Sequence, residues 1–599
     1  MKLPSLTSLL KKSGETFKRF SIALCFSFLG AGLGIYLVHS SSSMSPSSQI
    51  YFNMLMSSYL GMLLSISITV GMERKYFTRN SKILMHMASI AFALLFYFSL
   101  PDEFVLTSTV RFFLFVLSLH LLIAFIPFIQ VKELNGFWQY NKSLFLRILS
   151  SALYSGVLFV GLAIAIAAVQ NLFKVDLDEK IYAYLWVFIV GVFNTWFFLS
   201  GFPAKLEDLD LETDYPKGLK LFTQYVLLPL ISIYLLILYA YLFKIIIQAQ
   251  WPVGYVSILV LCFSIAGIFS LLLIYPVRND EGNKWILLYS RLFYFALYPL
   301  LILLFLAIER RIQEYGITEQ RYFVLLIALW LLFIASYFLL SKTKNIKLIP
   351  ISLCFIASGS SFGPWGAFSV SKRSQQKHLS ELFEKNKLLK EGKFVKSARK
   401  ISYEDHQEIV SVSHYLLEVH GVESLQPFFT QNLDEIIERK STDSYSYERQ
   451  NKIDSLLAVQ YENSVGAPNS FEFYGALNEV KKVSGFDYVV DDFSAYTSND
   501  STIRTYKIGQ RDYKICFVPL NNELIAFDTK NINTKISFNI IAMIRKLMLK
   551  RTSERNKLPT EDLTFDAGNE EMDIRLLINN IHGIYEEEKT QLILLNASL

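Results

Sequence analysis

The chain has 599 residues, of which 52% are hydrophobic and only 18% are charged, whereas soluble domains carry about 25% charged residues. Its mean hydropathy is positive. These values exclude an ordinary soluble globular protein, a collagen, a disordered chain and a disulfide scaffold. The net charge of +6 is spread over membrane loops and forms no basic face, which also excludes nucleic-acid binding.

Charge divides the chain near Lys372. Residues 1–371 contain 28 Lys and Arg against 18 Asp and Glu, whereas residues 372–599 contain 30 against 34. All 7 tryptophans lie in the first part, as expected if Trp is used at membrane interfaces. We therefore predict an α-helical polytopic membrane bundle in residues 1–371, a helical linker or subdomain in 372–469, and a soluble, strand-rich α+β domain in 470–599.

Eleven apolar runs are long enough for a membrane helix. Such a helix needs about 20 residues, because only a helix satisfies its own backbone across about 30 Å of hydrocarbon. The runs are residues 20–38, 50–72, 83–100, 110–128, 148–173, 181–202, 224–243, 253–275, 292–308, 322–340 and 348–368. The first is longer than a signal-peptide core and is expected to be retained. The last is the weakest, because Ser, Gly and Pro dilute it.

Lys and Arg are distributed unevenly between the two sides of these runs. The N-terminal tail and the even-numbered loops carry 21 of them, and the odd-numbered loops carry 7. The positive-inside rule then predicts a cytoplasmic N-terminus and, with eleven spans, a C-terminal domain outside the cytoplasm. If the eleventh run does not cross, the C-terminal domain lies on the cytoplasmic side instead.

The hydrophilic part, residues 372–599, is predicted to form helices followed by strands. Ser402 and Asp405 are a plausible capping pair for a helix that stops at Gly421. The predicted helices are 406–419, 433–440, 448–461 and 540–549, and the predicted strands are 471–474, 488–490, 502–508, 513–518, 523–527, 574–581 and 591–595, with a turn at Gly509-Gln510. The domain contains no phosphate loop, paired metal-ligand spacing or nucleophile elbow, so an interaction domain is favoured.

Two polar residues lie inside apolar runs. His120 is near the middle of the fourth run, and Asn194 lies in the sixth. A residue of this kind is a functional candidate, because polar groups are costly in hydrocarbon. For both residues we favour a hydrogen bond to a neighbouring helix over contact with a substrate, and we expect His120 to be neutral and to face protein.

Acidic residues alternate in the sixth loop. Asp208 and Asp210 are one residue apart, and two such carboxylates can share Mg²⁺ or Mn²⁺, as in a lipid-linked transferase. Alternating acids also describe a solvated loop, and this alternative is favoured. We therefore predict no metal and keep the pair only as a weak candidate.

The ninth loop is the most specific candidate site, because it carries three arginines on the side where positive charge is otherwise rare. They are interspersed with glutamates and tyrosines; the candidate residues are Arg310, Arg311, Tyr315, Glu319 and Arg321. The guanidinium groups can pair with glutamates of the same loop and form a hinge, or bind the phosphate of an anionic lipid or an envelope polymer. The two alternatives are equally supported.

Several motifs then identify a family resemblance. They are Tyr215-Pro216-Lys217-Gly218-Leu219-Lys220, Thr223-Gln224-Tyr225 with Pro229, Trp251-Pro252, residues 309–322, Phe362-Gly363-Pro364-Trp365, Phe368-Ser369-Val370-Ser371 and Ser374-Gln375. With them the chain resembles the bacterial membrane family DUF4153, a domain of unknown function, best over residues 140–375. The resemblance implies a multi-pass protein of the bacterial inner membrane without an established activity.

Three functions are compatible with these observations. The first is an envelope scaffold or transport-associated protein in the lipid bilayer, whose exported C-terminal domain binds a protein partner. The second is a carrier or channel for a small or lipid-linked solute, and the third is the metal-dependent transferase. We rank them in this order, because charge in mid-span is scarce and catalytic motifs are missing, and we expect no cofactor and, on balance, no enzymatic activity.

Overall fold

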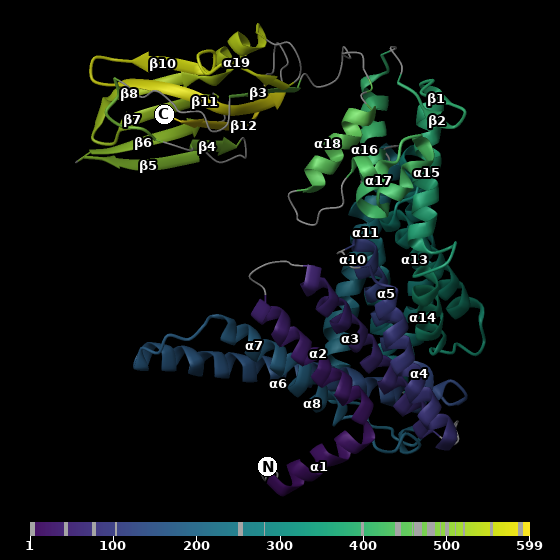
Figure 1. Cartoon of the computed structure of the whole chain (residues 1–599). Helices are drawn as coiled ribbons and strands as arrows, with labels where there is room; N and C mark the ends of the chain where they lie inside the picture. Colours follow the sequence, from purple (N-terminus) through teal and green to yellow (C-terminus); the bar gives the residue numbers. More distant parts are fainter. Residues whose placement is uncertain are drawn as a thin grey trace. The chain divides into compact units, whose positions relative to one another are not determined.

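The computed structural model describes residues 6–40, 46–74, 79–101, 105–248, 255–280, 282–396, 400–437, 445–457, 459, 470–475, 485–490, 493–496, 502–509, 511–518, 522–550, 555–584 and 591–598. The chain forms two compact units. The first comprises Met1–Ala398 and Gln407–Val459, and the second comprises Arg399–His406 and Gln460–Leu599. The first unit is mainly helical and the second is built mainly on β-sheets (Figure 1).

Ten helices among the described residues are long and apolar enough to cross a membrane. In chain order they are α2 (Ser21–Ser40), α3 (Pro46–Glu73), α4 (Arg79–Phe98), α5 (Leu106–Phe125), α6 (Asn135–Phe173), α7 (Lys180–Phe188) continued by η2 (Ile189–Asn194) and α8 (Thr195–Leu199), α9 (Lys217–Phe222) continued by η4 (Thr223–Leu227) and α10 (Leu228–Gln248), α11 (Tyr255–Leu273), α12 (Trp285–Tyr315) and α13 (Glu319–Leu340). They follow the first ten apolar runs of the sequence, so the predicted helical bundle is confirmed.

The eleventh run forms a shorter helix than expected. Helix α14 (Leu348–Ser360) has 13 residues, which corresponds to about 20 Å at 1.5 Å per residue. It ends in a turn that contains Gly363, whose φ of +81° is in the left-handed region, and Pro364. The described residues therefore contain ten helices that meet the usual length for a membrane span, and α14 is shorter than that length.

Although short, α14 runs antiparallel along α5. At one end Arg111 Nε of α5 donates a hydrogen bond to the carbonyl oxygen of Ser361 (3.2 Å). At the other end Lys347 Nζ donates to the carbonyl oxygen of Phe128 (3.2 Å), just beyond the end of α5. Between them, hydroxyl groups of the two helices are hydrogen-bonded. The two ends of α14 therefore lie near the two opposite ends of α5.

These contacts define two ends of the bundle. The proximal end is the one at which α1 (Leu6–Arg19) joins α2; there, Arg19 Nε donates to Glu73 Oε1 (2.7 Å) and Arg19 Nη2 to the Pro203 carbonyl oxygen (2.7 Å). The distal end holds the residue 316–318 loop and the start of α5, where Thr107 Oγ1 donates to the Val419 carbonyl oxygen (3.3 Å).

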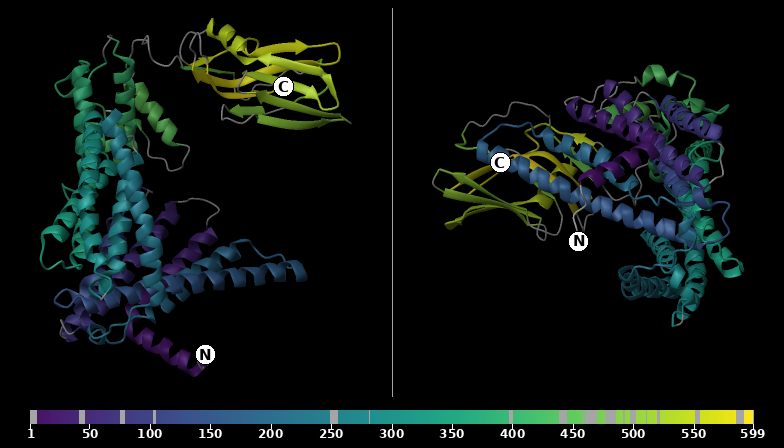
Figure 2. Two further views of the ribbon diagram at one scale, coloured as in Figure 1. Left: turned by 180° about the vertical axis from the view of Figure 1, so that it is seen from behind. Right: turned by 90° about the horizontal axis from the view of Figure 1, so that it is seen from below.

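Helix α6 has 39 residues, which gives a length of about 58 Å. Its first turns are buried at the proximal end, whereas its second half is apolar and exposed, with Leu172 at 78% exposure. Figure 2 shows α6 and α7 projecting together from the other helices. An apolar helix exposed in this way matches a surface covered by lipid.

A helical subdomain follows the bundle and lies in the first unit except for its residues 403–406. Its elements are α15 (Ala367–Lys385), the strands β1 (Leu389–Lys390) and β2 (Lys393–Phe394), α16 (Tyr403–His420), η6 (Val422–Ser424), η7 (Gln426–Phe428), α17 (Leu433–Ile436) and α18 (Tyr445–Leu457). Helix α16 matches the predicted helix 406–419, and it stops before Gly421, whose φ is +76°. Ser402 Oγ accepts a hydrogen bond from the Asp405 amide (3.1 Å) as expected for a cap. Helices α17 and α18 end at Ile436 and Leu457, earlier than the predicted ends at 440 and 461, because residues 437 and 459 are not helical. Residues 438–440, 458 and 460–461 of the two predictions lie outside the described residues.

The second unit contains two large sheets. Its elements are β3 (Ser470–Tyr474), β4 (Phe493–Tyr496), β5 (Thr502–Ile508), β6 (Arg511–Val518), β7 (Glu523–Asp528), β8 (Asn531–Asn539), α19 (Ile540–Met548), β9 (Arg555–Lys557), β10 (Thr564–Gly568), β11 (Asp573–Ile584) and β12 (Gln591–Ser598). Strands β5 to β8 form an antiparallel meander, and the other sheet has the order β4-β12-β11-β3-β9, with β10 paired to β11. The predicted α+β class is confirmed.

The buried core of this unit explains which of its strands could be predicted from the sequence. Phe471, Phe473 and Phe517 are almost completely buried and pack with Ile540 and Ile544 of α19. Strands with alternating buried residues, such as β3, β6 and β7, were predicted close to their observed limits, and so was the more exposed β5.

Other strands of the second unit were predicted incorrectly or not predicted. Residues 488–490 are not a strand, and the predictions omitted β4, β8, β9 and β10. β8 has polar residues at many positions, and β9 has three residues that pair in parallel with β3. Such strands depend on their partners rather than on their own composition. Gln510 of the predicted turn lies outside the described residues, whereas Gly509 has a φ of +61°.

Candidate functional site

The candidate site is the ninth loop, which joins α12 to α13 at the distal end. Helix α12 ends at Tyr315 because Gly316 adopts a φ of +68°, and α13 begins at Glu319. A Cβ atom at Gly316 would lie 2.8 Å from Gln375 Nε2. The connection is therefore tight, and α15 packs directly against it.

Side chains of α15 satisfy the backbone of this loop. Ser374 Oγ accepts a hydrogen bond from the Ile317 amide (2.8 Å), and Gln375 Nε2 donates to the carbonyl oxygens of Tyr315 (2.8 Å) and Ile317 (3.3 Å). Gln375 is 2% exposed. Because backbone groups that lack a partner are costly when buried, these contacts fix α15 on the loop.

The carboxylate of Glu319 joins three helices, and we call it and its three partners the Glu319 hub. Oε1 accepts a hydrogen bond from Ser371 of α15 and lies 3.2 Å from His420 Nε2 of α16, and Oε2 accepts one from the Tyr415 hydroxyl of α16. The side chains of Glu319 and His420 are 14% and 4% exposed. Burial and the neighbouring carboxylate raise the pKa of Tyr415 above its ordinary value, so its hydroxyl remains a donor. Glu319 also lies in the first turn of α13, where a negative charge is favourable.

Two of the three arginines of the loop, Arg310 and Arg321, have partners within it. Arg310 Nε donates to Glu314 Oε1 (2.7 Å) across one helical turn, with both side chains well exposed. Arg321 Nη1 donates to the carbonyl oxygens of Tyr315 (2.9 Å) and Gly316 (2.7 Å). The pairing with a glutamate that the hinge alternative requires is present for Arg310, whereas Arg321 bonds to backbone carbonyl oxygens instead. A phosphate-binding role of the loop stays a proposal, for which the exposed edge at Arg311 is the available surface.

The remaining distal motif residues surround the same loop. Tyr322 of α13 donates to the Trp365 carbonyl oxygen (2.8 Å), and Trp365 Nε1 donates to the Gly359 carbonyl oxygen (3.0 Å). The motifs at 309–322, 362–365 and 368–375 therefore meet at one place. Tyr415 and His420 were not singled out from the sequence, and Tyr415 is 96 positions away from Glu319. The sequence shows no spacing that links them.

His120 does not have the environment that we expected. Its side chain is exposed on the outside of the bundle, and its Nδ1 lies 2.8 Å from the Val116 carbonyl oxygen of the same helix. The ring of Tyr59 is 6.5 Å away, centroid to centroid. The expectation that His120 faces protein and bonds to a neighbouring helix is wrong, because position 120 falls on the outer face of α5.

Asn194 does bond between helices. Its Oδ1 accepts a hydrogen bond from Ser155 Oγ of α6 (3.2 Å). It lies at the end of the π-helical segment η2. This segment also packs closely on α2, since a Cβ atom at Gly191 would lie 3.0 Å from that of Ala31. The prediction of an interhelical contact for Asn194 is confirmed.

Asp208 and Asp210 lie in the short helix η3 (Asp208–Asp210) at the proximal end. Asp210 Oδ2 accepts a hydrogen bond from Arg74 Nη2 at 2.6 Å. Its other carboxylate oxygen, Oδ1, is packed against Gly136 of α6. A Cβ atom at this glycine would lie only 1.9 Å from Oδ1. No group of three or more His, Cys, Asp or Glu side chains suited to a metal occurs among the residues that could be searched. Asp210 therefore acts in a salt bridge.

Comparisons with known proteins place the chain in a family. The profile described as Domain of unknown function (DUF4153) matches residues 22–388, which include the bundle and α15. The chain is 26% identical over 245 residues to the uncharacterized protein PM1469 of Pasteurella multocida (strain Pm70), an alignment that covers 39% of this chain and 41% of that protein. No solved structure matches the chain. Because the match extends over more than half of its length, the chain belongs to the DUF4153 family.

Proposed function

We propose that this protein is a scaffold of the bacterial inner membrane, whose bundle holds the helical subdomain in place and carries the second unit as an exported interaction domain. The observation that carries the proposal is the Glu319 hub. Three helices meet there through one partly buried carboxylate. Buried polar contacts of this kind select one arrangement of helices more than they add stability. A domain that was only tethered to the membrane would not need them.

The sidedness of this scaffold follows from charge and connectivity. The 21 Lys and Arg of the tail and the even-numbered loops are predicted to face the cytoplasm, and these segments include Arg19 and Lys347 of the proximal end. The Glu319 hub and the contact between Thr107 and Val419 belong to the distal end. We therefore place the helical subdomain on the periplasmic side. Helix α14 supports this placement, because it reaches from one end of α5 to the other.

Cysteine labelling tests the sidedness. In a variant with its four natural cysteines replaced, Gln431→Cys in the subdomain and Lys12→Cys in α1 each introduce one exposed thiol. An impermeant maleimide should label Gln431→Cys in intact spheroplasts and Lys12→Cys only after lysis. The reverse pattern would contradict the proposed orientation.

Complementation tests the scaffold role. Tyr488→Glu and Ile503→Glu change two residues of the second unit whose side chains are 62% and 57% exposed, respectively. If this unit binds a partner, the double variant should accumulate in the membrane and fail to rescue the envelope phenotype of a deletion strain. A matched double variant, Lys507→Glu with Lys514→Glu, keeps these apolar side chains. Full rescue after removal of residues 460–599 would place the activity in the bundle and overturn the proposal.

A further inference from the structure

A small pocket at the proximal end is lined by two cationic side chains. Arg278 follows α11 and Lys344 lies in the loop between α13 and α14. The hydroxyl groups of Tyr275, Ser290 and Tyr294 also line it, and the remaining lining residues, among them Leu287, are apolar. None of the lining residues is acidic. The pocket therefore combines two positive charges with hydroxyl groups and an apolar wall.

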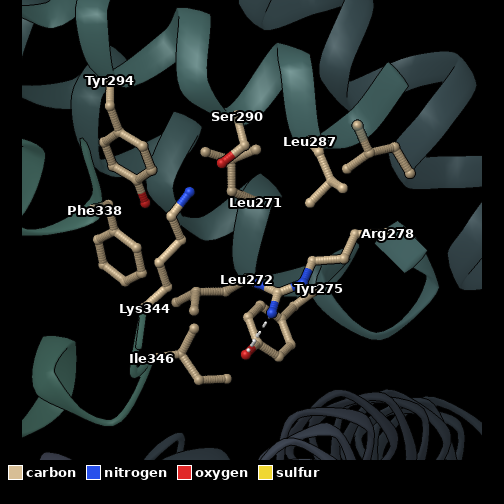
Figure 3. Close-up of a pocket in the computed structure, with 11 residues that line it drawn as sticks. Leu271, Leu272, Tyr275, Arg278, Leu287, Ser290, Tyr294, Phe338, Lys344 and Ile346 are labelled. Atoms are coloured by element: carbon tan, nitrogen blue, oxygen red, sulfur yellow. Dashed lines mark hydrogen bonds between the residues drawn. The ribbon is translucent and has the colours of Figure 1, made fainter. Parts of the chain in front are cut away.

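The two cations enter the pocket from opposite sides. Figure 3 shows Lys344 reaching towards Ser290 and Tyr294, and Arg278 reaching in from the other wall. Arg278 is oriented by Tyr275, whose ring centroid is 3.7 Å from the guanidinium carbon and whose hydroxyl accepts a hydrogen bond from Nη2 (2.9 Å). A guanidinium has five N–H donors, so most of them remain available to a ligand.

No carboxylate neutralises these charges among the described residues, since neither Arg278 nor Lys344 forms an ion pair there. Two positive charges that line one small cavity favour an anion between them. The cavity has a volume of about 40 Å³, and a water needs about 10–15 Å³ on this measure. The space therefore suits the few free oxygens of one phosphate group.

The mouth of the pocket lies beside an apolar outer surface. Leu287, which lines the pocket, is 45% exposed, and its neighbours Leu288 and Trp285 are 60% and 43% exposed. Trp is typical of the interface between headgroups and hydrocarbon. A phospholipid bound here would place its phosphate between the two cations and its acyl chains along this apolar surface.

From these observations we infer that Arg278 and Lys344 form a binding site for the phosphate group of an anionic phospholipid. This site is separate from the Glu319 hub and does not depend on the proposed scaffold role. A bidentate contact from Arg278 and a point charge from Lys344 are the usual pair of phosphate ligands.

Native mass spectrometry of the full chain can test this site with phosphatidylglycerol and phosphatidylcholine as probes. The wild type should retain phosphatidylglycerol preferentially, and Arg278→Gln combined with Lys344→Gln should weaken this retention about tenfold or more. Lys342→Gln is the matched control, because Lys342 is exposed on the same loop and does not line the pocket. If the double variant does not fold, Lys344→Gln alone should still lower retention, because Lys344 lies in a loop.

An excess of inorganic phosphate shows whether the site binds only the phosphate of a lipid headgroup or also free phosphate. If it leaves phosphatidylglycerol bound, the ligand is the lipid; if it displaces the lipid from the wild type, the site accepts free phosphate as well. Equal retention of both lipids by the wild type would overturn the inference. Undiminished retention of phosphatidylglycerol by both Lys344→Gln and the double variant would also overturn it.

Discussion

Glu319→Ala is the most informative change to the candidate site, because it removes the acceptor shared by Ser371, Tyr415 and His420. A hydrogen bond to a charged group contributes about 1.5–3 kcal/mol, and a buried donor that is left without a partner costs about 1–3 kcal/mol. The side chain of Glu319 is 14% exposed, so water can replace part of what is lost. We therefore expect the subdomain to be held less tightly by about 3 kcal/mol, the lower limit for breaking a buried pair.

Hydrogen exchange measures this loss directly. Local opening of α16 exposes its amides, and 1.4 kcal/mol corresponds to about a tenfold change in an equilibrium. The C-terminal half of α16 should therefore exchange about 100-fold faster in Glu319→Ala than in the wild type. The amides of α3, which is far from the hub in the chain and largely buried, should be unaffected and serve as an internal reference.

Glu314→Ala is the matched control for this measurement. Glu314 is a glutamate of the same loop, but its side chain is 43% exposed and its salt bridge to Arg310 lies on the surface. Exposed pairs contribute about 0–1 kcal/mol, so exchange in α16 should change by about fivefold at most. If Glu319→Ala accelerates exchange no more than Glu314→Ala does, the hub does not hold the subdomain, and the scaffold proposal loses its main support.

Three further predictions concern other parts of the first unit. Gly267→Ala should lower the thermal stability of the purified protein, because its Cβ would lie 2.2 Å from a buried phenylalanine ring, whereas Gly156→Ala, which meets nothing within 4 Å, should not. Equal melting temperatures would contradict this packing. Asp210→Asn should reduce accumulation in the membrane because it weakens the bond to a buried arginine, whereas Asp208→Asn should not. Loss of an activity with both variants, restored by added Mg²⁺, would instead support a metal. If the exposed edge of the ninth loop binds a phosphate, Arg311→Lys should fail to rescue the envelope phenotype of a deletion strain at normal protein levels, because lysine lacks the planar fork. Full rescue would remove the case for a phosphate site at this loop.

Local composition was sufficient to predict the membrane bundle. The apolar runs predicted ten spanning helices in the correct order, because a helix in hydrocarbon must be apolar along its whole length and satisfies its backbone without other segments. The eleventh run was predicted too long, since the length of α14 depends on a turn at Gly363 rather than on average hydropathy. The second unit was predicted less completely, because strands such as β9 exist only through their pairing.

The sequence determined which residues of the ninth loop are unusual, and the tertiary structure decided what they contact. Charge on an unexpected side of the membrane can be read from the order of residues alone. The partners of Glu319 cannot, because Ser371, Tyr415 and His420 come from two later helices and meet it only after α15 and α16 have packed on α13. The same holds for His120, which faces outward because the packing of α5 against its neighbours determines which of its faces is covered.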